Sequence, residues 1–278
     1  MTLREREEYY RKYLNKVIDE MVSTSSGLEA GIKQNLTKLI DISLQYSRLG
    51  KSFQFEANRN LEESINEITE QLRTDIFNYI YLQCEEADKI AQESNGVKVD
   101  NSKALLIFLS TKIADLTLDN RIEAHVLKMT SEIEAYVAAG IYKGLNRSQI
   151  LSAYMFNIKK PYLAPLLLEA FKEGGFKAER ISSKGLTLGK GKYVAAFNDL
   201  KRTARDNIFG AYGQMQQRIW ERDSEYVGWT TYRGSSYPCE VCDMEAGRFH
   251  SKSESYYGYH VGCVCIPIPV YKSDLVKK

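Results

Sequence analysis

Residues 238–265 read PCEVCDMEAGRFHSKSESYYGYHVGCVC, and the organisation of the chain is best understood from this stretch. It contains four of the five cysteines and two of the three histidines of the 278-residue chain. In a reducing compartment, cysteines gathered in this way favour a metal site over a disulfide framework. The charged N-terminal sequence MTLREREEYYRKYL lacks the apolar core of a signal peptide, so we expect synthesis in a cytosol and no membrane association.

The spacing of these cysteines and histidines predicts a tetrahedral zinc site. A C-x2-C pair, here Cys239 and Cys242, lets two thiolates from one tight turn reach the same ion. His260, Cys263 and Cys265 offer three further donors, so five candidates compete for the four positions around Zn²⁺. One ligand set consists of Cys239, Cys242, His260 and Cys263, and the other replaces His260 with Cys265. The alternatives to a metal are a disulfide or plain burial of the thiols.

The stretch has the features of a structural metal centre and lacks those of a catalytic one. No carboxylate stands at metal-ligand spacing beside the cysteines, and the chain contains no H-E-x-x-H motif. The zinc deaminase signature is incomplete, because PCEVC is present but no H-x-E precedes it. His250 lies in the intervening loop and is a poorer ligand candidate. We therefore expect a structural Zn²⁺ ion, no catalytic residues and no enzymatic activity.

Upstream of this stretch, residues 1–175 predict helices only. Apolar residues recur at steps of three and four, and no segment shows the sustained alternation of a strand. Residues 22–27, VSTSSG, carry the Ser and Gly that favour caps and turns, so we expect one helix to end there and another to begin. The expected helices span residues 2–22, 28–48, 56–94, 103–117, 120–142 and about 146–157, with a last one between Pro165 and Gly174.

The character of the sequence changes after residue 175. Residues 176–195 are rich in glycine and predict a flexible linker, whereas residues 196–222 return to a helical pattern. Residues 226–232 alternate as a strand does, and residues 263–271 predict a second strand that its prolines place at a sheet edge. The expected fold is mainly α, with an all-α domain over residues 1–175 and a small α+β zinc-binding domain over residues 196–278.

Nucleic-acid binding is a different class of function that the sequence allows. Lys201, Arg202 and Arg205 lie near the start of the helix expected over residues 196–222, where arginines beside tyrosines could contact phosphates and bases. The plainer alternative is an amphipathic helix packed on the last domain. The formal net charge of +2 is too small to indicate nucleic acid by itself.

The C-terminal region resembles a known family. The sequence YVGWTTYRGSSYPCEVCDMEAG, followed by HVGCVC and a proline-rich strand, is similar to the Mu F-like head morphogenesis family, the minor head proteins of tailed phages. The match covers about residues 196–271, and Val261 and Val264 stand where the family usually has Pro and Arg. The matching positions are Trp229, Thr230, Thr231, Cys239, Cys242, Gly247, His260, Cys263 and Cys265.

The resemblance implies a minor capsid protein of the virion. Such a protein is made in the host cytoplasm, lies at the portal vertex or in the capsid interior, and takes part in head assembly. The implied partners are the portal protein and other head proteins, with DNA as a further contact and no small-molecule substrate. Some relatives carry ADP-ribosyltransferase-like domains, and TYRGSS around Arg233 is superficially similar to their first motif, but no E-x-E follows it.

Overall fold

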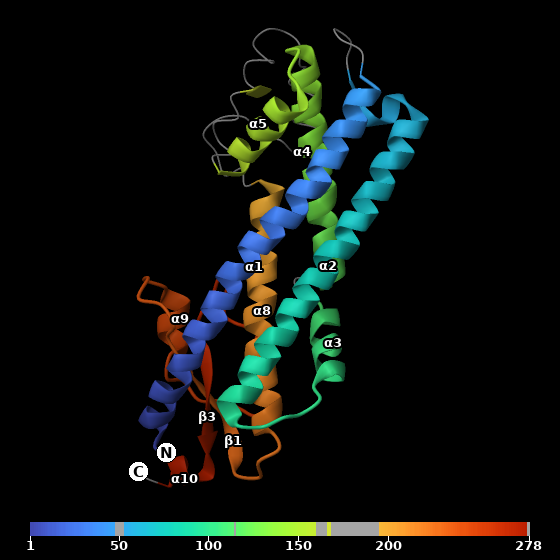
Figure 1. Cartoon of the computed structure of the whole chain (residues 1–278). Coiled ribbons are helices and arrows are strands. Elements are labelled where there is room, and N and C mark those ends of the chain that lie inside the picture. The colour runs from blue at the N-terminus through green and yellow to red at the C-terminus, as the bar shows by residue number, and fades with distance from the viewer. Residues whose placement is uncertain (48–52, 114, 160–165, 168–194, 277–278) are drawn as a thin grey trace. The chain divides into compact units, whose positions relative to one another are not determined.

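Figure 1 shows the computed structural model of the chain, which describes residues 1–47, 53–113, 115–159, 166–167 and 195–276. Within these ranges the protein is mainly helical and has one small antiparallel sheet near the C-terminus, as the sequence predicts. None of the helices in the described ranges has both the length and the apolar character needed to cross a bilayer. The expected linker and the helix expected before it lie outside the described residues, apart from residues 166, 167 and 195.

The first helix, α1, runs without interruption over Leu3–Gln45, so the expected break at residues 22–27 is wrong. The hydroxyl groups in this segment have partners that do not interrupt the helix. Thr24 Oγ1 is buried and lies 2.8 Å from Gln83 Oε1, and Ser25 Oγ accepts a hydrogen bond of 3.0 Å from Arg205 Nε. Contacts with distant segments therefore outweigh the local preference of Ser and Thr for caps and turns.

The remaining helices follow the expected spans closely, with one exception. Helix α3 (Ser102–Ser110) ends before the expected residue 117, because Thr111 has an extended backbone and Ile113 forms a bridge with Leu116. Gly96 follows α2 directly and Gly144 comes two residues after the end of α4; their φ values of 63° and 69° lie in the left-handed region that glycine favours. The elements that agree with expectation are α2 (Arg59–Asn95), α4 (Leu118–Tyr142), α5 (Arg147–Lys159) and α8 (Ala196–Trp220), with a short 3₁₀ turn, η1 (Phe55–Ala57), before α2.

The sheet has three antiparallel strands in the order β2-β1-β3. Strand β1 (Tyr226–Tyr232) is central, β2 (His250–Ser251) is short, and β3 (Ile266–Tyr271) forms the other edge. Both expected strands are confirmed, and the edge position of β3 suits its two prolines, which cannot donate to a ladder. Gly228 in β1 allows β2 to approach, because a Cβ there would lie only 2.1 Å from the His250 carbonyl oxygen.

The described chain forms two compact units, each assembled from separate stretches of sequence. Unit 1 comprises Met1–Ser26, Asn78–Leu118 and Arg202–Lys278, and unit 2 comprises Gly27–Phe77 and Asp119–Lys201. This division differs from the expected domains over residues 1–175 and 196–278, because α1, α2 and α8 each contribute residues to both units. Unit 1 contains the sheet and all the expected metal ligands.

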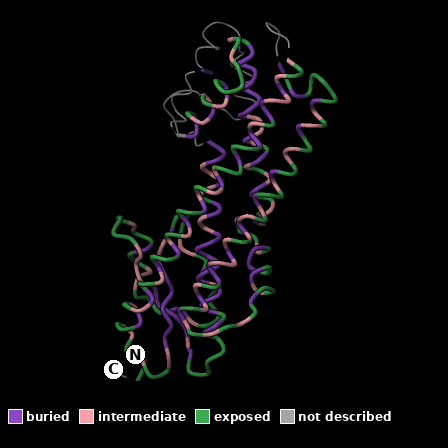
Figure 2. The backbone as a smooth tube through the Cα atoms, in the orientation of Figure 1, coloured by how far each residue is buried: buried purple, intermediate pink, exposed green. Residues whose placement is uncertain are grey.

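Unit 1 has an aromatic core around α8 and β1. Trp220, Trp229 and Tyr256 are almost completely buried, and Figure 2 shows long buried stretches on these elements. Trp220 Nε1 donates to Asn95 Oδ1 at 2.9 Å and lies 3.2 Å from the hydroxyl oxygen of Tyr10. Through these contacts the end of α8 packs on the start of α1 and the end of α2, and this framework supports the sheet.

Candidate metal centre

The pairing of β1 with β3 brings the two halves of the cysteine stretch together. Tyr232 at the end of β1 is paired with Ile266 at the start of β3. Cys263 and Cys265 come immediately before β3, and the chain that leaves β1 leads to Cys239, which precedes helix α9 (Glu240–Glu245). The two ligand-bearing segments therefore start from neighbouring strand ends, although about twenty residues separate them in sequence.

Two tight turns present the donor atoms. In the first, the Asp243 amide donates to the Cys239 carbonyl oxygen at 2.9 Å, which closes the first turn of α9 around Cys242. In the second, the Cys263 amide donates to the His260 carbonyl oxygen at 3.0 Å, and Gly262 takes a φ of 76° that favours glycine. The Gly262 amide also donates to Asp206 Oδ1 at 2.8 Å, so α8 holds the second turn in place.

The expected ligands lie within one cluster. Cys239, Cys242 and His260 form a group whose donor atoms are all within 4.8 Å of one another, and Cys242, Cys263 and Cys265 form a second such group. Cys242 Sγ is 3.9 Å from Cys263 Sγ, close to the separation of about 3.8 Å that two Zn–S bonds of about 2.3 Å require in a tetrahedron. All five cysteines of the chain are free thiols. The cluster can hold a metal ion, and both His260 and Cys265 remain candidates for the fourth position.

His260 is oriented as a metal-binding imidazole is. Its Nδ1 lies 2.9 Å from the Val261 carbonyl oxygen and donates to it in the neutral ring, while Nε2 lies 3.0 Å from Cys242 Sγ. Metal-bound histidines commonly donate their second ring N–H to a backbone carbonyl in this way. The ring is nevertheless exposed, whereas Cys242, Cys263 and Cys265 are buried and Cys239 is half-buried. The cluster thus has a thiol-rich interior and a more open side.

The thiols share protons through their mutual hydrogen bonds. The hydrogen bond from Cys265 lowers the pKa of Cys263, and the same bond raises the pKa of Cys265. Burial raises the pKa of Cys242 to about 11, whereas backbone hydrogen bonding lowers the pKa of Cys239. Since thiolates bind metals and thiols do not, loading of this cluster releases protons, and its affinity for a metal decreases in acid.

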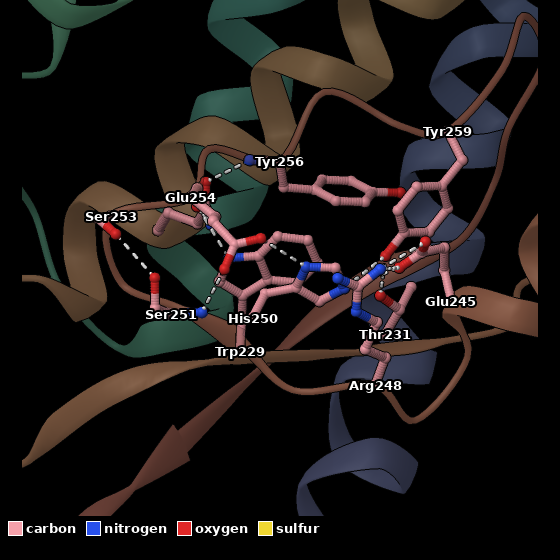
Figure 3. A network of polar contacts seen from close by, with 11 residues as sticks. Trp229, Thr231, Glu245, Arg248, His250, Ser251, Ser253, Glu254, Tyr256 and Tyr259 are labelled. Carbon is pink, nitrogen blue, oxygen red and sulfur yellow. Dashed lines mark hydrogen bonds and ion pairs between the residues drawn. The ribbon is translucent and has the colours of Figure 1, made fainter.

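An aromatic and polar network, drawn in Figure 3, contacts the cysteine segment through Tyr256. The Tyr256 hydroxyl donates to the Cys265 carbonyl oxygen and lies 3.9 Å from Cys263 Sγ. The Tyr259 hydroxyl is hydrogen-bonded to Thr231 Oγ1 on β1. Both tyrosines come from the segment YYGY, whose aromatic residues have no metal-ligand character and therefore do not indicate a place beside the site from sequence alone.

His250 belongs to this network and not to the metal cluster. Its ring stacks on Trp229 with centroids 3.9 Å apart and an interplanar angle of 7°. Nδ1 lies 3.2 Å from Glu254 Oε2, and Nε2 lies 3.3 Å from Glu245 Oε2. Because both ring nitrogens face carboxylates, His250 links β2 with the end of α9 and with the loop that follows β2, and it belongs to neither donor group.

The three basic residues near the start of α8 differ in their surroundings. Arg205 Nε donates to Ser25 Oγ on α1 at 3.0 Å. Lys201 Nζ lies 4.8 Å from the centroid of the Phe197 ring on its own helix. Arg202 is exposed and also takes part in an interaction within the protein. Two of the three side chains are thus directed into contacts within the chain.

No protein-family model matches the chain, and no curated protein or solved structure gives a significant match. The resemblance seen over residues 196–271 therefore stays a prediction that depends on the motifs themselves.

Proposed function

We propose that this protein is a minor head protein of a tailed phage that takes part in head morphogenesis through binding at the portal vertex. The proposal depends mainly on one observation. The C-x2-C turn after the WTT strand and the later H-x2-C-x-C segment, which carry the resemblance to the Mu F-like family, converge in the folded chain on one cluster that could hold a metal. Two short segments that matched the family only by chance would not be expected to meet in the folded chain, so their convergence supports the resemblance.

In this proposal the metal is Zn²⁺ and its role is structural. Four of the five donors, Cys239, Cys242, His260, Cys263 and Cys265, would hold the ion, which supplies cross-linking of the β1 and β3 ends in place of a large apolar core. The sheet has only three strands, one of them of two residues, and such a small element gains from a cross-link. We propose no catalytic step at the cluster and no enzymatic activity.

The proposed mode of action is docking. The protein would contribute helical surfaces for contact with the portal and other head proteins inside the virion, and the zinc cluster would keep the C-terminal fold intact during assembly. DNA is a secondary partner in this proposal, because Arg205 and Lys201 already make contacts within the chain. A salt-dependent DNA affinity that Arg202→Ala reduces would raise its importance.

Metal analysis tests the structural part of this proposal. We expect purified protein to contain zinc, and Cys239→Ser to lower both the zinc content and the Tm. Cys84→Ala is the matched control, because Cys84 is a buried thiol on α2 outside the cluster and should leave the zinc content unchanged. Absence of zinc together with an unchanged Tm in Cys239→Ser would refute a structural zinc centre.

Co-assembly tests the biological part independently of the metal. The protein should co-elute with the portal protein of the same phage when the two are expressed together, and it should be found in purified virions by mass spectrometry. If the protein binds zinc but is absent from virions and does not bind that portal protein, the head-assembly role is wrong while the metal centre stands.

A further inference from the structure

Arg233 makes contacts that neither the metal motif nor the resemblance explains. It follows β1 directly, and its side chain reaches the turn that carries Cys239 and Cys242. Nη1 forms an ion pair with Asp243, and Nη2 donates to the Tyr237 carbonyl oxygen. Tyr237 lies two residues before Cys239, and Asp243 comes directly after Cys242. One planar guanidinium therefore ties together both ends of the C-x2-C turn.

The charges of two of the cysteines also act on this guanidinium. The hydrogen bond to Asp243 is the main reason that the pKa of Arg233 is raised, and the charges of Cys242 and Cys265 add to it. Arg233 Nε is buried and has no hydrogen-bond partner among the described residues. A buried N–H group without an acceptor is unfavourable unless negative charge nearby compensates it. Thiolates at Cys242 and Cys265 would provide that charge.

A loaded metal centre requires such a counter-charge. A divalent ion with four thiolates carries two net negative charges, and one with three thiolates and a neutral imidazole carries one. Negative charge in a partly buried site is costly without a nearby cation. Arg248, the next basic residue along the chain, pairs instead with Glu245 on the far end of α9 and is 60% exposed at its side chain. Both arginines are paired with a carboxylate, but only Arg233 also contacts the segment just before Cys239, through the Tyr237 carbonyl oxygen.

We propose that Arg233 is a positioning residue of the metal centre, which fixes the C-x2-C turn and neutralises the thiolates, and so sets the affinity for the metal. This inference rests on the metal centre of the proposed function and is independent of the role in phage heads. Two effects are combined in one side chain. The fork of the guanidinium orients the turn, and its charge stabilises the anionic ligands.

Variants of Arg233 separate these effects when zinc affinity is measured by competition with a chromophoric chelator. Arg233→Gln removes both the orienting guanidinium and its charge. It should weaken zinc binding about 10- to 100-fold, the usual effect of losing a residue that supports metal ligands. Arg233→Lys keeps the charge and Asp243→Asn keeps the guanidinium, so each variant should lose less zinc affinity than Arg233→Gln. Arg248→Gln is the matched control and should bind zinc as the wild type does.

A second measurement distinguishes a role at the metal from general stability. Arg233→Gln should lower the Tm of the zinc-loaded protein more than it lowers the Tm of the metal-free protein. An unchanged zinc affinity in Arg233→Gln, or an equal loss of Tm with and without zinc, would overturn the inference. If the wild type itself binds no zinc, the proposed metal centre is refuted together with the role of Arg233. Asp243→Asn keeps the test decisive if Arg233→Gln does not fold.

Discussion

Replacement of Gly213 by alanine tests the packing that supports the metal cluster. Gly213 lies within α8, and a Cβ at this position would be 2.6 Å from Cδ1 of Tyr256 and 3.1 Å from Cε1. The ring has little freedom to move away. Its hydroxyl donates to the Cys265 carbonyl oxygen, and its edge packs on Trp229 with centroids 5.3 Å apart.

The expected magnitude is the balance of two opposing terms. Alanine is a better helix former than glycine and should stabilise α8 by about 1 kcal/mol. The steric overlap should cost about 1 to 3 kcal/mol, as overpacking of a close-packed core usually does. We therefore expect Gly213→Ala to lower the free energy of unfolding by up to about 2 kcal/mol, and to weaken metal binding because Tyr256 contacts the backbone of Cys265.

A matched glycine provides the control. Gly31 lies in the interior of α1, is exposed, and would place its Cβ at least 4 Å from any other group. Gly31→Ala should therefore show only the gain in helix propensity and raise the free energy of unfolding by up to about 1 kcal/mol. Urea unfolding followed by circular dichroism measures both variants. Equal stabilisation by Gly213→Ala and Gly31→Ala would show that Tyr256 does not pack against α8 as described.

Three further predictions concern other parts of the molecule. Cys242→Ala should reduce zinc affinity more than His260→Ala or Cys265→Ala in a chelator competition, because Cys242 belongs to both donor groups; equal losses in all three would contradict that geometry. Thr24→Val keeps the shape of the side chain but removes the hydroxyl near Gln83. It should lower the free energy of unfolding by about 1 to 3 kcal/mol, as measured by thermal or urea unfolding. An unchanged free energy of unfolding would show that the hydroxyl is not needed there. Backbone hydrogen bonding from Ser251, followed by His250, lowers the pKa of Glu254 below its usual 4.5, so the charged carboxylate adds stability above that pH and loses it in acid. Glu254→Gln should therefore have a lower Tm than the wild type at neutral pH, and the difference should vanish as the pH falls through the depressed pKa.

The sequence predicted features that depend on local pattern. Alternation marked β1, the two prolines placed β3 at an edge, and periodic apolar residues predicted α2, α4 and α8 to within a few residues. The ligand candidates could be named because the C-x2-C and H-x2-C-x-C spacings each bring donors together within a single turn.

The features it missed depend on contacts between distant segments. Nothing local in VSTSSG shows that Gln83 and Arg205 will accept and donate hydrogen bonds there, so α1 was expected to break. Tyr256 becomes part of the metal environment only once Gly213 leaves room for its ring. In the same way, the role of Arg233 depends on the fold of the Tyr237–Asp243 turn around its guanidinium.

The three-segment composition of unit 1 limits how this gene can be dissected. A fragment encoding only residues 196–271 would carry all the recognisable motifs, yet its Trp220 would lack Tyr10 and Asn95, which belong to α1 and α2. Such a fragment would expose a large aromatic surface and aggregate. Transfer of unit 1 between genes would therefore require its three segments, Met1–Ser26, Asn78–Leu118 and Arg202–Lys278, to move together.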